Sequence, residues 1–202
     1  MNESKRDNGN GARPTIFIDR DGVVNRNRDD YVKSWGEFEF LPGSLEALRM
    51  LAGRGVRVVV VTNQSVVGRG IISGEALEGI HRQMVAEVEA HGGRIDAVLC
   101  CPHAPDDGCD CRKPRPGLLL EATRRFRIDP AMSCFVGDNL CDLKAAQAAG
   151  IPFVMVLSGK GLPASLRRAR AGYPLRWIAR DLESAARWFV RRDGWEKEEA
   201  AA

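Results

Sequence analysis

The chain has 202 residues, 44% hydrophobic and 28% charged, which is enough apolar material for one well-buried core without a second domain of equal size. A net charge of +3 is too small to indicate a nucleic-acid or membrane partner. No run approaches the roughly 18 consecutive apolar residues of a membrane-spanning helix, and the polar first residues include no hydrophobic signal segment. We therefore expect a cytoplasmic monomer with one domain at 14–193, a disordered tail at 1–13 and a second tail at 194–202.

Short apolar runs alternate along the chain with segments of helical period. The runs have the length and composition of buried parallel strands and lie at 15–19, 56–63, 97–101, 133–138 and 152–157. Apolar residues recur at helical spacing in 44–51 and 75–91, and a helix containing "DLKAAQAAG" ends at Gly150. This alternation predicts an α/β fold, with a parallel central sheet flanked by helices. Ligands of such sheets bind beyond the carboxyl ends of the strands.

Polar side chains follow four of these strands. The first strand ends in "DRDG" (19–22), the second in "TNQS" (62–65) and the fourth in "GDN" (137–139), while a loop after the third leads to "RK" (112–113). Each residue type has an ordinary structural role, since Asp caps helices, Thr is common in strands and Lys usually lies on the surface. Together they bring three carboxylates, a hydroxyl and a lysine to one edge of the sheet. This combination indicates a catalytic site.

The loop "CPHAPDDGCDCRKPRPG" (101–117) concentrates potential metal ligands. In a chain with no secretion signal, six cysteines indicate metal binding rather than a disulfide framework. Cys101, His103, Cys109 and Cys111 are four potential ligands, and a zinc ion held by four protein ligands has no position left for substrate. Such an ion would be structural and would fix the loop at 100–112. The alternative is a polar histidine beside three reduced thiols, because the Cys-x-His and Cys-x-Cys spacings are tighter than those of zinc fingers.

Four motifs together resemble the haloacid dehalogenase-like phosphatase superfamily: "DRDGVVN", "VVTNQS", "RKPRPG" and "VGDNLCD". The resemblance covers about residues 15–160 and implies a Rossmann-like fold. "TNQSVVGRG" and the cysteine loop are also similar to the D-glycero-D-manno-heptose-1,7-bisphosphate phosphatases and the histidinol-phosphate phosphatases. Those families carry a zinc loop where others carry a cap domain, so we expect no large cap. Val23 stands where the superfamily usually has Thr, at a position not expected to contact phosphorus.

The superfamily chemistry assigns a role to each strand-end residue. Phosphate ester hydrolysis brings an anionic nucleophile onto an anionic phosphoryl group, so cations must offset the repulsion. Asp19 is expected to attack and form an aspartyl-phosphate, while Asp21 protonates the leaving oxygen and then activates water. Mg²⁺ is expected on the side chains of Asp19 and Asp138 and on the main-chain carbonyl of Asp21. Thr62 and Lys113 would stabilise the transferred phosphoryl group.

The predicted substrate is D-glycero-D-manno-heptose 1,7-bisphosphate, hydrolysed at its C7 phosphate. Asn63 and Ser65 are expected to orient this substrate. Arg69 and Arg112 are candidates for binding its second phosphate, because guanidinium groups recognise phosphate by paired hydrogen bonds. The segments "NQSVVGRG" and "RKPRPG" favour the heptose bisphosphate by resemblance, and leave the accepted anomer open.

Three alternatives remain open. Histidinol phosphate would call for an acidic contact, which Glu37 or Glu39 could supply. A nucleic-acid 3′-phosphatase could use the segment from Lys160 to Arg192, with nine basic residues against two acidic ones, although we expect that segment to be a solvated helical face. The aromatic residues available there for base stacking are Tyr173, Trp177, Trp188 and Phe189. The third alternative is a zinc-stabilised binding module without catalysis.

Several other residues are assigned on weaker grounds. Asp142 is either a partner of the catalytic site or a cap of the following helix. His81 and His91 are interpreted as surface or packing residues. Cys100 is interpreted as a packing residue that faces away from Cys101.

Overall fold

The computed structural model describes residues 13–159 and 177–191. Their strands form one parallel six-stranded sheet in the order β3-β2-β1-β4-β5-β6. The strands are β1 (Thr15–Ile18), β2 (Arg57–Asn63), β3 (Ala97–Cys101), β4 (Ser133–Gly137), β5 (Phe153–Val156) and β6 (Trp177–Ala179). The helices are η1 (Trp35–Glu37), α1 (Ser44–Gly53), α2 (Ser65–Gly68), α3 (Gly74–Ala90), α4 (Gly117–Phe126), η2 (Pro130–Met132), α5 (Leu140–Ala148) and α7 (Leu182–Val190).

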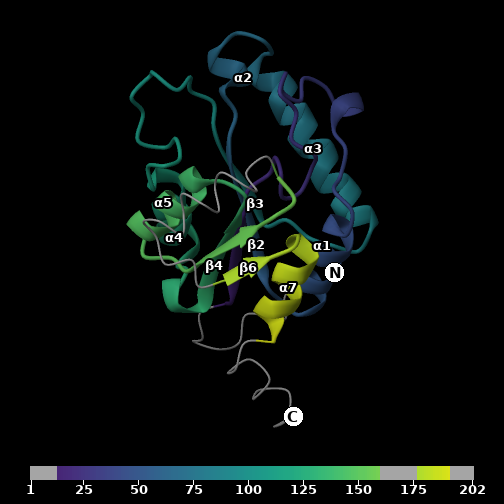
Figure 1. Ribbon diagram of the computed structural model, residues 1–202. Helices are drawn as coiled ribbons and strands as arrows, with labels where there is room; N and C mark the ends of the chain where they lie inside the picture. The colour runs from purple at the N-terminus through teal and green to yellow at the C-terminus, as the bar shows by residue number, and fades with distance from the viewer. Residues whose placement is uncertain (1–12, 160–176, 192–202) are drawn as a thin grey trace, which may run out of the picture.

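Helices cover both faces of the sheet. Figure 1 shows α1, α3 and α7 on one side and α4 and α5 on the other. Successive side chains of a strand point to opposite faces, so Val58 and Val60 of β2 join the core beneath α1, α3 and α7. Val59 and Val61 join the second core, beneath α4 and α5. This double burial explains why the strands appear in the sequence as continuous apolar runs.

The strand order places the predicted site at a point where the direction of the chain's crossovers reverses. From β1 the chain moves outward to β2 and β3, and then returns to β4 on the other side of β1. In the parallel register, Ile18 at the end of β1 lies beside Val60 and Val136. The carboxyl ends of β1, β2 and β4 therefore share one edge, which is where ligands bind in sheets of this kind.

The predicted fold class is confirmed. All five predicted strands are present, with boundaries that differ by at most one residue at either end. The helices α1, α3 and α5 lie in the predicted segments, while α4 was not predicted. Within the described residues, the connections from β1 to β2 and from β2 to β3 contain only η1 and the helices α1, α2 and α3. No large cap interrupts them.

Strand β6 and helix α7 were missed because they lie in the strongly basic segment from Lys160 to Arg192. That segment was predicted to be a solvated helical face, but α7 buries a narrow stripe of apolar side chains in the core. That stripe consists of Leu182, Ala185, Ala186 and Phe189. Arg187 lies on the exposed face and pairs with Glu183 at 2.6 Å. The charges thus occupy the side opposite the stripe.

The predicted tails lie outside the described residues, except for Arg13. Its guanidinium donates to the carbonyl of Gly55 at 2.7 Å and to Asp96 at 2.9 Å, so Arg13 packs with the domain although it was predicted to belong to the tail. The predicted tail at 194–202 and the basic stretch at 160–176 are not described. Within 13–159 and 177–191, no helix has the length and apolar character needed to span a membrane.

The packing of α7 predicts that the last helix is part of the core. Phe189 has no exposed surface, so Phe189→Ala should lower the free energy of unfolding by about 3–5 kcal/mol. Ile178→Ala is the matched control, because Ile178 of β6 is 45% exposed and should lose less than about 1 kcal/mol. Urea denaturation of both variants measures the difference. Equal effects would mean that α7 does not contribute to the cooperative core.

Candidate active site

Asp19 stands directly after β1, between the ends of β2 and β4. Its main-chain N–H donates to the carbonyl of Val136 at 2.9 Å, which continues the β1–β4 pairing past the last strand residue. Its Oδ1 accepts from Lys113 Nζ at 2.8 Å and from the main-chain N–H of Arg20 at 2.7 Å. Burial raises the pKa of Asp19 to about 8; Lys113 opposes the shift, and the carboxylates of Asp142 and Asp138 add to it.

Lys113 is the buried cation of the site. Its ammonium donates to Asp19 at 2.8 Å, to Asp142 at 2.7 Å and to the main-chain carbonyl of Val61 at 2.8 Å, so each of its three N–H bonds has an acceptor. Burial would lower the pKa of Lys113, but the charges of Asp142 and Asp19 outweigh it and raise the pKa. Lys113 therefore stays charged, and it joins residues from β1, β2 and α5.

Asp142 fulfils both of the roles that the sequence left open. Its Oδ2 accepts from the main-chain N–H of Asn139 at 3.1 Å and closes a capping box at the start of α5. Its Oδ1 is the partner of Lys113. The side chain is completely buried, so a single carboxylate both begins the helix and balances the lysine.

Three carboxylates gather around this lysine. Asp19, Asp138 and Asp142 each present one oxygen, and the three oxygens lie within 4.8 Å of one another. Carboxylate oxygens gathered in this way are ligands that Mg²⁺ prefers. The residues present therefore fit a magnesium ion.

Two glycines confine the carboxylate of Asp138. A Cβ atom at Gly22 or at Gly159 would collide with this carboxylate, so both main chains approach it without a side chain. Gly22 also has φ +86°, a left-handed conformation that glycine adopts without strain. The tight "DRDG" turn therefore brings the chain after Asp21 against the acid at the end of β4.

Asp21 has a different environment from Asp19. Its Oδ1 accepts from Arg20 Nη2 and from Asn25 Nδ2, both at 2.9 Å, and its Oδ2 accepts from Gln64 Nε2 at 2.6 Å. Burial would raise the pKa of Asp21, but the Arg20 charge and these hydrogen bonds outweigh it and lower the pKa. The two acids of the "DRD" motif are thus held by separate sets of partners.

The "TNQS" motif contacts Asp21 and Lys113. Thr62 is buried, and its hydroxyl accepts from Gln64 Nε2 at 2.9 Å. The side-chain amide of Asn63 pairs with the main chain of Lys113, donating to its carbonyl and accepting from its N–H, both at 3.0 Å. Asn63, expected to orient substrate, thereby positions the lysine. Ser65 is buried at the start of α2.

Arg69 and Arg112 lie on two segments that contact each other. Arg69 is exposed at the end of α2, and the N–H of Gly68 beside it donates to the carbonyl of Pro102 at 2.8 Å. Arg112 is half-buried in the cysteine loop and donates to the carbonyl of His103 at 3.2 Å. The hydrogen bond from α2 to the loop therefore fixes the segments that carry the two predicted phosphate-binding arginines.

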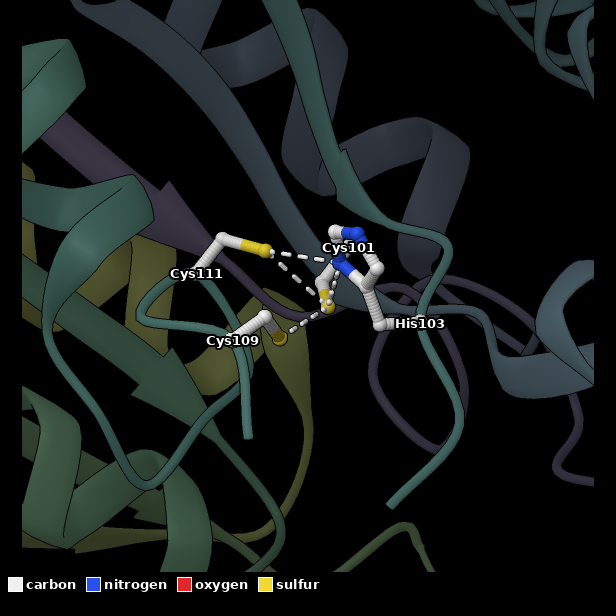
Figure 2. A group of neighbouring side chains, drawn as sticks. All are labelled: Cys101, His103, Cys109 and Cys111. Carbon is white, nitrogen blue, oxygen red and sulfur yellow. Dashed lines mark hydrogen bonds between the residues drawn. The ribbon is translucent and has the colours of Figure 1, made fainter. Parts of the chain in front are cut away.

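The four predicted soft ligands converge, as Figure 2 shows. Cys101 Sγ lies 3.6 Å from Cys109 Sγ and 3.2 Å from Cys111 Sγ, while His103 Nδ1 lies 3.5 Å from Cys101 Sγ and 3.2 Å from Cys111 Sγ. With metal–sulfur bonds of about 2.3 Å, a tetrahedral zinc ion would hold sulfur ligands roughly 3.7 Å apart. The cluster therefore fits one four-coordinate soft metal ion, and Lys113 follows two residues after Cys111.

The sequence did not reveal the three residues that hold Asp21. Arg20, Asn25 and Gln64 all belong to motifs that were recognised, but none was given a role. His81 was interpreted as a surface or packing residue, whereas its Nε2 lies 3.2 Å from Arg20 Nη1. Only the motif positions of the three donors gave a signal, because the contact with His81 depends on how α3 packs.

A family model described as HAD-hydrolase-like matches residues 110–185. The D-glycero-beta-D-manno-heptose-1,7-bisphosphate 7-phosphatase of Pseudomonas aeruginosa is 42% identical over 151 residues, which cover 75% of this chain and 85% of that protein. The chain belongs to the haloacid dehalogenase-like hydrolases. The enzyme of the same name from Bordetella bronchiseptica is 46% identical over 146 residues, covering 72% of this chain and 82% of that protein.

Two further comparisons bear on substrate and metal. The D-glycero-alpha-D-manno-heptose-1,7-bisphosphate 7-phosphatase of Mycobacterium bovis is 45% identical over 133 residues, covering 65% of this chain and 70% of that protein. A crystal structure of D,D-heptose bisphosphate phosphatase from Bordetella bronchiseptica, complexed with magnesium and phosphate, has a TM-score of 0.82 and 42% identity. That match covers 87% of this chain and 97% of the other. These similar proteins are phosphatases of the same superfamily.

The close approach of Gly159 to Asp138 predicts a severe effect of a single methyl group. Gly159→Ala should displace the Asp138 carboxylate and lower kcat/KM for phosphate release by about 100-fold or more, while raising the Mg²⁺ concentration needed for half-maximal activity. Gly53→Ala is the control, since no neighbouring atom lies within 4 Å of an added Cβ there. Steady-state assays across a Mg²⁺ series compare the two. Normal Mg²⁺ dependence in Gly159→Ala would contradict the assignment.

Proposed function

We propose that this chain is a Mg²⁺-dependent phosphatase that hydrolyses the C7 phosphate of D-glycero-D-manno-heptose 1,7-bisphosphate. The observation that carries the chemistry is the arrangement of Asp19, Asp138 and Asp142 around the buried ammonium of Lys113. The substrate is supported by relatives 42–46% identical that are named for it. Relatives named for the α and β anomers have similar identities, 45% and 42–46%, so the anomer is left to experiment.

In the first step, a carboxylate oxygen of Asp19 attacks phosphorus, and the bond between phosphorus and the C7 oxygen breaks. Asp21 must be protonated for this step, although Arg20 and the hydrogen bonds around it favour the carboxylate. It gives that proton to the departing oxygen, which leaves as the sugar hydroxyl. Thr62 and Lys113 lie beside Asp19 and offset the charge of the phosphoryl group. Contact between Lys113 and that group would require one of its three present hydrogen bonds to be exchanged.

In the second step, Asp21 is a carboxylate and acts as the base. It removes a proton from water, whose oxygen attacks the aspartyl-phosphate and releases inorganic phosphate. Asp19 returns to its carboxylate form and Asp21 to its protonated form, so the cycle balances. Bound Mg²⁺ would neutralise charge on the phosphoryl oxygens in both steps, held by Asp19, Asp138 and the main-chain carbonyl of Asp21.

We infer that Arg69 and Arg112 bind the second phosphate of the sugar. Their segments are joined by the hydrogen bond from Gly68 to Pro102, at the rim to which the loop delivers Lys113. Paired guanidinium hydrogen bonds are suited to a phosphate monoester. Asn63 and Ser65 would act at the same side of the site, Asn63 through its hold on Lys113.

The alternatives have less support. Glu37 accepts from the main-chain N–H of Lys33 at 2.9 Å, and Glu39 makes a two-point pair with Arg26, so both acids already have partners and neither is set aside for the amine of histidinol phosphate. The aromatic residues suggested for nucleic-acid stacking pack inward. Phe189 is buried. The ring centroids of Trp177 and Trp188 are 4.9 Å apart, and both rings pack against the core. Tyr173 lies outside the described residues.

We propose Zn²⁺ as the metal of the cysteine cluster, held by Cys101, His103, Cys109 and Cys111, and structural because no ligand position is left open. A cysteine cluster that binds a metal is typical of proteins in a reducing compartment, so we propose a cytoplasmic location. The monomeric state stays a prediction.

The proposed zinc site predicts a coupling between metal content and activity. The purified protein should contain one equivalent of Zn²⁺, and Cys109→Ser should lose it and lower kcat by about 10-fold or more, because the loop no longer holds Lys113. Cys100→Ala, a substitution outside the cluster, should keep both zinc and activity. Elemental analysis with parallel assays tests this. Full activity in zinc-free Cys109→Ser would contradict the proposed role of the loop.

The proposed substrate predicts a ranking among phosphate esters. With Mg²⁺, kcat/KM should be highest for one anomer of the heptose bisphosphate, compared with histidinol phosphate and a 3′-phosphorylated oligonucleotide. Asp19→Asn should abolish phosphate release while the protein stays folded, since no nucleophile remains. Chelation of Mg²⁺ should abolish it reversibly. A preference for histidinol phosphate would overturn the substrate but keep the mechanism, and activity in Asp19→Asn would overturn both.

A further inference from the structure

We propose that Arg20 is a positioning residue for acid–base catalysis: its buried guanidinium, together with the side-chain amide of Gln64, fixes the carboxylate of Asp21. The inference rests on the role proposed above for Asp21. A general acid must lie within hydrogen-bond reach of the oxygen that it protonates, so the orientation of its carboxyl group decides how well it works.

The carboxylate of Asp21 is held at both oxygens. Arg20 Nη2 and Asn25 Nδ2 donate to Oδ1, and Gln64 Nε2 donates to Oδ2. These donors come from β1's end, from the turn after it and from the end of β2, so rotation of the carboxylate would break bonds to two separate segments. The same Gln64 amide also donates to Thr62, which ties the acid to the phosphoryl-binding side of the site.

The main chain of Arg20 does not require an arginine. Its carbonyl accepts from the N–H groups of Val24 at 2.8 Å and Asn25 at 3.1 Å, and these bonds form the "DRDG" turn with any side chain. What the side chain adds is its contact with Asp21, with His81 and with the ring of Phe38, whose centroid lies 5.8 Å away.

A stability role explains this guanidinium poorly. Arg20 is 1% exposed, and its Nε has no hydrogen-bond partner among the described residues. Burying a guanidinium with an unpaired N–H costs free energy that a well-packed apolar side chain would avoid. The contact with Asp21 gives the residue a function that outweighs this cost.

The guanidinium is itself fixed from outside the catalytic motifs. It donates to His81 Nε2, so that nitrogen carries a free lone pair and the imidazole is neutral. Burial and the charge of Arg20 lower the pKa of His81 to about 4, so this acceptor persists at neutral pH. Phe38 beside η1 supplies an aromatic face. Arg20 thus links Asp21 to α3 and to the segment between β1 and α1.

The test compares two leaving groups through kcat/KM, which reports the steps up to transfer of phosphorus to Asp19. A sugar or other alkyl oxygen needs a proton to leave, whereas p-nitrophenolate does not. Asp21→Ala should therefore lose about 100-fold or more with the best alkyl phosphate of the panel above, and much less with p-nitrophenyl phosphate. Arg20→Met should show the same pattern, with about 10- to 100-fold loss for the alkyl ester and under about 3-fold for the aryl ester.

Three further variants keep the test decisive. Gln64→Met removes the donor to Oδ2 and should show the same pattern, even if Arg20→Met folds poorly. The double variant Arg20→Met/Asp21→Ala should lose no more than Asp21→Ala alone, because Arg20 acts only through that carboxylate. Arg82→Met is the matched control, an exposed arginine on α3 that should change neither activity.

The outcomes separate this inference from the proposed function. If Arg20→Met and Gln64→Met lose both activities equally, or if the double variant loses the product of the two single effects, the guanidinium is structural and the inference is wrong. If Asp21→Ala itself shows no difference between the two esters, the assignment of Asp21 fails and the inference fails with it. A different preferred alkyl substrate would change the proposed substrate alone.

Discussion

The buried ammonium of Lys113 is the interaction on which the site depends. It neutralises part of a carboxylate cluster drawn from β1, β4 and α5, and a buried charge without partners would cost several kcal/mol. The loop that carries Lys113 has little apolar material with which to fix itself. Asn63 pairs with its main chain, and the four soft ligands join the loop to the end of β3. The metal ion proposed for this cluster would therefore support the catalytic site by holding the loop, without taking part in the chemistry.

The two acids of "DRD" are two residues apart, yet their environments shift their pKa values in opposite directions. Asp19 is buried among other carboxylates, which raises its pKa, whereas Asp21 is surrounded by donors, which lower its pKa. These separate environments suit the two roles proposed above. A nucleophile that also binds a cation needs neighbouring acids to complete the cation's ligands, and a group that transfers protons needs a fixed orientation. The tight turn at Gly22 makes this separation sterically feasible within four residues.

The sequence predicted what depends on local pattern. Buried strands have a simple apolar signature. Because ligands bind at the carboxyl ends of parallel strands, the sequence alone predicted that Asp19, Lys113 and Asp138 lie at one site. Contacts that depend on side-chain direction or on packing between distant segments were not accessible. The Asn63 side chain bonds to the main chain of Lys113. His81 contacts Arg20, which lies 61 residues earlier in the sequence. Helix α7 was missed because its buried stripe is half alanine and because it lies in a strongly basic segment.

The long segment between β1 and α1 folds over Arg20 and helps to fix its guanidinium. Arg26 and Glu39 bond through their main chains at 2.8 Å and fold the segment back on itself. The rings of Trp35 and Phe38 stack with their centroids 5.1 Å apart, and the Phe38 ring contacts the guanidinium of Arg20. The burial and orientation of that guanidinium thus depend in part on residues that belong to no catalytic motif. The orientation of the Asp21 carboxylate therefore depends on packing outside the four motifs as well as on the motifs themselves.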